Sequence, residues 1–319
     1  MKESGVKALG SFMVCCGVVV VALTGCAGGE PVSGSTSASA SASTSTSTSA
    51  STSATSPASS SPAAGIALPP AGAPADYQLG GAFPPASAVM VVTRDSTAPP
   101  APGLYSICYV NAFQSQPGVD WPSALVLHDA SGAPLRDPGW PDESIFDTST
   151  AANRTELLAR LTATVSGCSA AGYRAVEFDN LDSYTRSNGA LTVDDALAFA
   201  TQLVTLAHTN NLAAGQKNAP DLAARAHSAA GFDFAVAEEC IRFAECEAYA
   251  AVYGENVIDI EYAENLGGSG GAGAASSTDL TAAIAHVCAT SPRPRSTMVR
   301  DHSLTAPGSA TFVDQSCAP

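Results

Sequence analysis

Short apolar segments alternate with longer amphipathic ones from about residue 76 to the end of the chain. The short segments are rich in β-branched residues, which favour strands. They predict strands at 88–93, 105–110, 173–178, 212–216, 232–237, 257–260 and 297–299. The longer segments repeat apolar residues at helical spacing. They predict helices at 152–166, 193–209, 219–227 and 278–288.

Strands that alternate with helices predict a parallel α/β sheet. The length of 76–319 suits a single (β/α)8 TIM barrel, and a short segment near 144–146 would supply the third strand. A doubly wound open sheet is the alternative. The clearest helix is 193–209, because Thr192 is a suitable N-cap and Asp194 and Asp195 place acids in the first turn.

The N-terminus has the order of an export signal. Lys2 and Lys7 precede an uncharged stretch that is too short for a comfortable membrane span. It ends in Leu-Thr-Gly-Cys at Cys26, which resembles a bacterial lipobox. We therefore expect residues 1–25 to be a lipoprotein signal peptide and Cys26 to be lipidated, with an ordinary signal peptide as the alternative. The protein would then be exported and anchored by lipid alone to the outer face of the bacterial cell membrane.

Residues 26–75 form a low-complexity segment of Ser, Thr, Ala, Pro and Gly in which Glu30 is the only charge. Such a segment cannot bury enough apolar surface to offset its chain entropy. We expect a disordered linker that carries a folded domain at 76–319.

Six cysteines remain after the signal and Cys26 are set aside, an even number that suits disulfides in an exported domain. Fifteen pairings are possible, and Cys240–Cys246 is the most local. For the other four we adopt Cys108–Cys168 and Cys288–Cys317, which no spacing argument selects. No metal-binding spacing accompanies the cysteines or histidines, so we expect no metal or cofactor.

Charge narrows the choice of partner. The chain has 29 acidic and 14 basic residues and a formal charge of −15, which argues against nucleic-acid binding. This balance suits a cationic partner better. We expect a monomer.

Polar residues follow nearly every predicted strand. In parallel barrels these positions form the catalytic face. They include Asp95, Asn180, Asn218, Arg300 and Asp301.

Period-two geometry puts Glu177 and Asp179 on the same side of one strand, and Glu238 ends another. Carboxylates that face each other across a pocket are the apparatus of glycosidic-bond cleavage. Asp179 and Glu238 are therefore our candidate catalytic pair.

Lys217 is the only lysine after residue 25, and it stands at a strand end between Gln216 and Asn218. A chain that otherwise uses arginine needs a compact ammonium at this place. We hypothesise that Lys217 lies near Asp179 and keeps it ionised while the other acid stays protonated. A solvent-exposed lysine without a role is the alternative.

Seven ordered segments of the predicted barrel resemble glycoside hydrolase family 114. They are ICYVNAFQSQ (107–116), GWPDESIFD (139–147), AVEFDNLDSYTRSNGALT (175–192), AHTNNLAAGQKN (207–218), GFDFAVAEECIRFAEC (231–246), VIDIEY (257–262) and MVRDHSL (298–304). The resemblance implies a TIM barrel with endo-α-1,4-polygalactosaminidase activity. It also implies that Asp179 is the nucleophile and Glu238 the general acid/base of a retaining mechanism.

A cationic amino-sugar polysaccharide fits the acidic balance. For holding amines or hydroxyls we name Glu177, Asp182, Glu239 and Glu261. For stacking on sugar faces we name Tyr109, Trp140, Tyr184 and Tyr262. A surface-tethered carbohydrate-binding protein with an inactive barrel, and a glycosidase of another amino-sugar polymer, remain alternatives.

Overall fold

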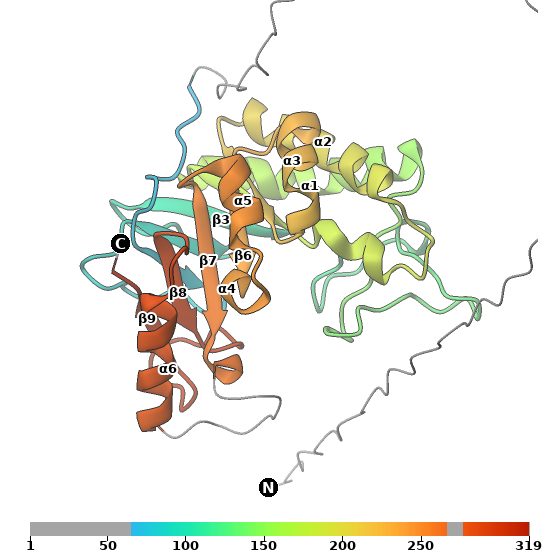
Figure 1. The fold of residues 1–319 in the computed structure, drawn as a ribbon. Coiled ribbons are helices and arrows are strands. Elements are labelled where there is room, and N and C mark those ends of the chain that lie inside the picture. Colours follow the sequence, from blue (N-terminus) through green and yellow to red (C-terminus); the bar gives the residue numbers. More distant parts are fainter. Residues whose placement is uncertain (1–64, 267–276, 319) are drawn as a thin grey trace, which may run out of the picture. The chain divides into compact units, whose positions relative to one another are not determined.

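A computed structural model describes residues 65–266 and 277–318 (Figure 1). The expected signal peptide, Cys26 and most of the linker lie outside these ranges. Within them, no helix combines the length and the apolar character needed to cross a membrane.

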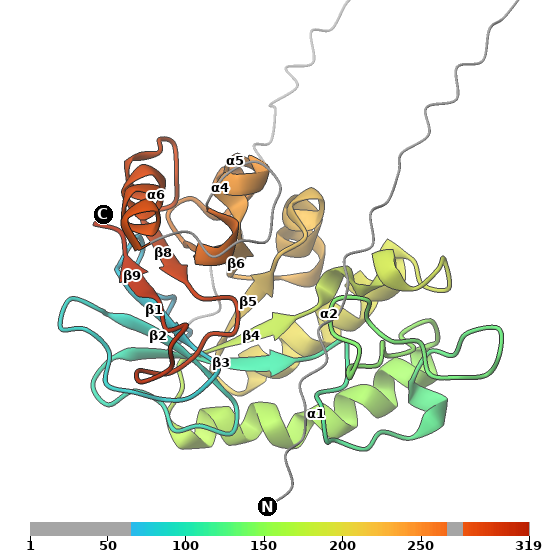
Figure 2. The same cartoon turned by 90° about the horizontal axis from the view of Figure 1, so that it is seen from below.

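Eight parallel strands follow one another around an α/β barrel, and a ninth strand pairs antiparallel with the eighth (Figures 1 and 2). The strands are β1 (Ala75–Gln78), β2 (Val91–Asp95), β3 (Tyr105–Asn111), β4 (Ala175–Asp179), β5 (Ala213–Lys217), β6 (Phe234–Glu238), β7 (Val257–Tyr262), β8 (Ser296–Arg300) and β9 (Asp314–Ser316). The predicted barrel is confirmed. Because the strand order never reverses, the doubly wound alternative is wrong.

Helices connect the strands from β3 to β8. They are α1 (Ala151–Ala171), α2 (Val193–Thr209), α3 (Ala223–Arg225), α4 (Cys240–Phe243), α5 (Cys246–Tyr253) and α6 (Ser277–Ala289). The connections at 79–90 and 96–104 contain no helix. Helix α2 has the predicted bounds. Its start is fixed by a capping box in which the Thr192 hydroxyl accepts from Asp195 N and the Asp195 carboxylate accepts from Thr192 N.

Side chains that alternate along the strands build two cores. Apolar residues such as Ala175, Phe234 and Ile258 fill the barrel interior. Outward-facing strand residues such as Phe178 pack against the helices. Gly215 leaves room for the Phe234 ring in the interior, since a Cβ atom at this position would lie 2.5 Å from that ring.

The segment expected as the third strand does not belong to the barrel. Ser144, Ile145 and Phe146 form isolated bridges within the long β3–α1 connection. The strand missing from the prediction is β1, whose sequence Ala-Asp-Tyr-Gln has no β-branched residue. It begins one residue before the expected start of the folded domain.

Three disulfides join the pairs Cys108–Cys168, Cys240–Cys246 and Cys288–Cys317. The first ties β3 to helix α1 and the third ties the end of α6 to the chain just after β9. Both therefore fasten a helix to the strand layer that it covers.

Arg300 joins the last parallel strand to the first. Its guanidinium is fully buried, pairs with Asp76 at 3.3 Å and donates to the carbonyl of Tyr77. It also donates to the carbonyls of Thr305 and Val313. We expected Arg300 and Asp301 to bind substrate, and this is wrong. Asp301 is also buried and accepts hydrogen bonds from Thr305 and Val313, so both residues fasten the barrel seam.

Replacing Arg300 by Ala should lower the free energy of unfolding by about 3–5 kcal/mol, because Asp76 and several carbonyls would lose a buried partner. Chemical denaturation measures this change. Arg295→Ala is the matched control, since its ion pair with Glu255 is more than half exposed on both sides. It should change stability by less than about 0.5 kcal/mol. Equal effects of the two variants would contradict a seam role for Arg300.

Candidate active site

Three neighbouring strands each end in a charged residue that points into the mouth of the barrel. These residues are Asp179 on β4, Lys217 on β5 and Glu238 on β6. The residue that follows each of them has a positive φ: Asn180, Asn218 and Glu239. A left-handed residue ends the strand at once, so each charged side chain stands on the last rigid position before its loop.

These three residues line a cavity of about 640 Å³ at the carboxyl ends of the strands. Its other walls come from the β3–α1 connection and from the segment after β8, which contribute Trp140, Glu143 and His302. The predicted residues Asp95, Tyr109, Asn180, Asp182, Asn218 and Tyr262 also line it. Half of the residues that line this cavity were therefore named from the sequence.

Lys217 lies among three carboxylates although its side chain is only 2% exposed. Its Nζ is 3.3 Å from Glu177 Oε1, 3.6 Å from Asp179 Oδ1 and 3.2 Å from Glu238 Oε1. The expected proximity of Lys217 to Asp179 is present, but the surroundings raise the pKa of Asp179 and lower that of Glu238, the reverse of the hypothesis that Lys217 keeps Asp179 ionised while the other acid stays protonated. Because Lys217 contacts both candidate catalytic acids, its charge by itself does not separate their roles.

Each of the three carboxylates has its own tyrosine partner. Tyr77 donates to Glu177 at 2.6 Å and Tyr109 donates to Asp179 at 2.7 Å. Tyr262 donates to Glu238. Tyr109 and Tyr262 were expected to stack on sugars, but their hydroxyl groups hold the acids in place. Both residues still line the cavity.

The surroundings of Asp179 and Glu238 separate their pKa values. Burial and the charge of Glu238 raise the pKa of Asp179 despite Lys217. Burial also acts on Glu238, but the ammonium of Lys217 and hydrogen bonds from Tyr262 and Asn218 outweigh it and hold the pKa of Glu238 below its usual range. The surroundings thus move the pKa of Asp179 up and that of Glu238 down.

Glu177 lies beneath the cavity and has no exposed surface. Burial raises its pKa to about 7, and its Oε2 has no hydrogen-bond partner among the described residues. The expectation that Glu177 binds substrate is therefore wrong. It supports Lys217 and Tyr77 from below instead, because period-two geometry places it one layer deeper than Asp179.

A second cation, Arg186, organises the wall beside Asp179. Its guanidinium contacts Asp137 at 2.6 Å and Asp182 at 2.9 Å, and it donates to Asn180 Oδ1 at 3.0 Å. Asp182 is thus engaged by a protein cation. Sequence reasoning missed Asp137 and Arg186 because they lie in connections rather than at strand ends.

Aromatic rings form the outer wall. Trp140 is about half exposed and stacks on His302, with ring centroids 5.7 Å apart. His302 in turn meets the edge of Tyr262 at 4.8 Å. Tyr184 lies instead in an adjoining cavity of about 450 Å³, together with Glu239 and Phe243. This second cavity shares Glu238 with the first, so the two form neighbouring compartments around one catalytic candidate.

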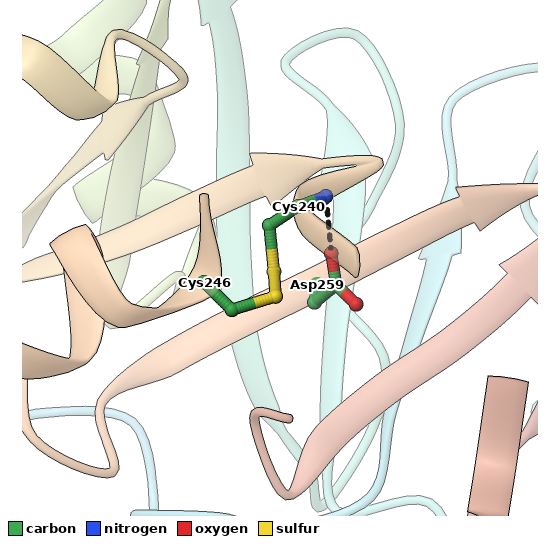
Figure 3. Close-up of side chains that lie close together, drawn as sticks. All are labelled: Cys240, Cys246 and Asp259. Carbon is green, nitrogen blue, oxygen red and sulfur yellow. Dashed lines mark hydrogen bonds between the residues drawn. A yellow bond between two sulfur atoms is a disulfide. The ribbon is translucent and has the colours of Figure 1, made fainter. Parts of the chain in front are cut away.

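Glu261 points away from the cavity, and its expected contact with substrate is wrong. It alternates with Tyr262 on β7, and its Oε1 accepts from Ile241 N at 2.8 Å in the first turn of α4. Burial raises its pKa to about 7. Its neighbour Asp259 accepts from Cys240 N in the same turn (Figure 3). Both acids therefore position the segment that follows Glu238.

Cys240, Cys246 and Asp259 are close enough to suggest a metal site. Figure 3 shows the two sulfur atoms bonded to each other. Metal ligation by cysteine requires thiolates, which a disulfide does not supply. This group does not fit a metal.

An α/β barrel that presents two carboxylates in a sugar-sized cavity has the architecture of a glycoside hydrolase. The model of glycoside-hydrolase family GH114 matches residues 54–318, and the chain belongs to this family. It is therefore a glycosyl hydrolase, as the sequence resemblance implied.

Solved structures share the fold. Ega3 of Aspergillus fumigatus, solved in complex with galactosamine, is 22% identical with a TM-score of 0.60, over 78% of this chain and 98% of Ega3. The glycoside hydrolase domain of PelA from Pseudomonas aeruginosa is 13% identical with a TM-score of 0.50, over 75% of this chain and 99% of that domain. No curated protein matches the chain.

Replacing Lys217 by Met should reduce activity at least about 100-fold and move the acidic limb of the pH–rate profile upward by about one unit or more. The reason is the sign of the charge effect. An ammonium lowers the pKa of the carboxylate that must be ionised, so its loss raises that pKa. Arg295→Met removes a positive charge at the surface and should leave the limb in place. An unmoved limb in a folded Lys217→Met protein would contradict this role.

Proposed function

We propose that the protein hydrolyses internal bonds of an α-1,4-linked, partly deacetylated galactosamine exopolysaccharide. The observation that carries this proposal is the meeting of Asp179 and Glu238 at a single ammonium in the cavity. The similarity in fold to Ega3, which was solved with galactosamine, supports the choice of sugar. The acidic balance of the chain supports a cationic polymer.

A retaining mechanism is supported by distance. Asp179 Oδ1 and Glu238 Oε1 lie 3.6 and 3.2 Å from the same nitrogen, so they are no more than about 7 Å apart. Carboxyl groups of retaining enzymes are about 5–5.5 Å apart, whereas inverting enzymes need about 6.5–9.5 Å to admit a water molecule. The upper bound admits the whole retaining range and only the lower end of the inverting range, so it is compatible with direct attack by one carboxylate on the sugar.

We assign the nucleophile to Asp179 and the general acid/base to Glu238. This assignment requires Asp179 to be ionised and Glu238 to be protonated when the glycosidic bond breaks, whereas the surroundings raise the pKa of Asp179 and lower that of Glu238. A cationic sugar provides the driving force. Its C2 ammonium is next to the carbon that Asp179 attacks, and a nearby positive charge favours the ionised form of Asp179.

Residues 1–75 complete the proposal. A signal peptide at 1–25, a lipidated Cys26 and the linker that follows it would place the barrel, whose first strand begins at Ala75, outside the cell and within reach of the polymer. The three disulfides support an oxidising compartment.

Asp179→Gly and Glu238→Gly should each lower the release of reducing ends from galactosamine oligomers at least about 1,000-fold. Added azide separates the two roles through the anomer of the glycosyl azide that forms. In the Asp179 variant azide replaces the nucleophile and gives the β-anomer, whereas in the Glu238 variant it attacks the glycosyl-enzyme and gives the α-anomer. Nuclear magnetic resonance distinguishes the two. Exchanged anomers would reverse the assignment, and two fully active variants would refute the site.

Added salt should weaken substrate binding and so slow the reaction at low substrate concentration. Raising NaCl to ~0.5 M shortens the Debye length to a few ångströms, so KM for deacetylated oligomers should rise several-fold while kcat stays nearly constant. Sucrose at equal osmolarity is the control. A KM that does not respond to salt would count against electrostatic recognition of the polymer.

A further inference from the structure

Glu143 differs from most other acids in the catalytic cavity. Six carboxylates line the described part of this cavity: Asp95, Asp137, Glu143, Asp179, Asp182 and Glu238. Four of them lie within 4 Å of a nitrogen of Lys217 or Arg186. Asp95 and Glu143 contact neutral partners only.

Both carboxylate oxygens of Asp95 accept hydrogen bonds from the protein, whereas only one oxygen of Glu143 does. Oδ1 of Asp95 accepts from the amide and hydroxyl of Thr97, and Oδ2 accepts from Gln116. Glu143 accepts a single hydrogen bond, from Asn111 Nδ2 to Oε2 at 2.8 Å. Among the residues that the structure describes, none donates to its Oε1.

The orientation of Glu143 is fixed from behind. Asn111 ends β3, and its Oδ1 accepts from Asn180 Nδ2 at 3.0 Å and from Gln114 N at 3.2 Å. These bonds define which side of the Asn111 amide is oxygen, so its NH₂ group must face Glu143. Asn180 also directs its own N–H to Asp179. One chain of hydrogen bonds thus links Glu143 to the candidate nucleophile.

We infer that Glu143 is a specificity residue whose free carboxylate oxygen binds the ammonium of an amino sugar in the cavity and so selects a free amine over an N-acetyl group. The inference rests on the proposed function, because it names how that same site recognises its substrate. An ammonium would give Glu143 the cation that Asp179 and Glu238 already have in Lys217. An N-acetyl group would bring bulk and no charge.

The electrostatic state of Glu143 agrees with this role. Burial and the charges of Asp179 and Asp137 raise its pKa to about 7, although the Asn111 hydrogen bond acts in the opposite direction. A half-buried carboxyl that is costly to ionise alone gains most from a cationic ligand.

The test compares Glu143→Gln with Asp142→Asn on oligomers of defined acetylation. Glutamine keeps an acceptor oxygen for Asn111 and removes only the charge. Asp142 is the adjacent residue on the same connection, but it is exposed and lines a different cavity. Both variants lose one negative charge, so a difference between them reports position rather than net charge. Thermal denaturation checks that both fold.

For Glu143→Gln we expect kcat/KM on fully deacetylated oligomers to fall at least about tenfold, mainly through KM. Mass spectrometry of products from partly acetylated oligomers should show a free amine at a fixed position relative to the cut in the wild type. Glu143→Gln should lose this preference, and Asp142→Asn should retain it.

An unchanged cleavage pattern in Glu143→Gln, or an equal loss of activity on free and acetylated residues, would overturn the inference and leave Glu143 as a support of its loop. A wild type that cuts no galactosamine oligomer would instead refute the proposed function itself. The two failures are therefore distinguishable.

Discussion

One buried ammonium holds the site together. Three carboxylates inside a barrel repel one another and lose hydration, and each effect alone is costly. Lys217 lies within 3.6 Å of Glu177, Asp179 and Glu238. Each of these carboxylates also accepts a hydrogen bond from a tyrosine hydroxyl. One cation cannot neutralise three anions. The surroundings of Asp179 and Glu238 move their pKa values in opposite directions, and two acids with separated pKa values suit acid–base chemistry.

The backbone explains why this cluster is rigid. Asp179, Lys217 and Glu238 are the last residues of adjacent strands, and each is paired in register with one neighbouring strand, at Asn111, Val236 and Ile260. The left-handed residue after each of them then turns the loop away. Asparagine adopts this conformation readily, but Glu239 does so at a cost, and its carboxylate is held by Arg242 and Asn265. The strands thus fix the positions of the charged side chains, and the loops supply the rest of the cavity wall.

The sequence predicted what short-range patterns encode. Alternation on β4 placed Glu177 and Asp179 on one face, and the capping residues of α2 marked its start. The sequence does not show how deep a side chain lies in the barrel, so Glu177 and Arg300 were predicted to contact substrate although both are buried. Strand β1 was missed because its stability comes from neighbouring strands rather than its own residues. Glu143 was missed because only the tertiary fold of a long connection brings it to the cavity.

Charge balance links recognition to catalysis under the proposed function. The described part of the cavity has more carboxylates than cations, and the pKa of Asp179, the group assigned to attack, is raised. A bound ammonium adds positive charge on the side of Asp179 and Glu143, which lowers the cost of ionising both. A neutral sugar would leave the same carboxylates uncompensated, so it would bind more weakly and also leave the pKa of Asp179 raised. Selection of a cationic sugar and activation of the nucleophile would then have one electrostatic cause.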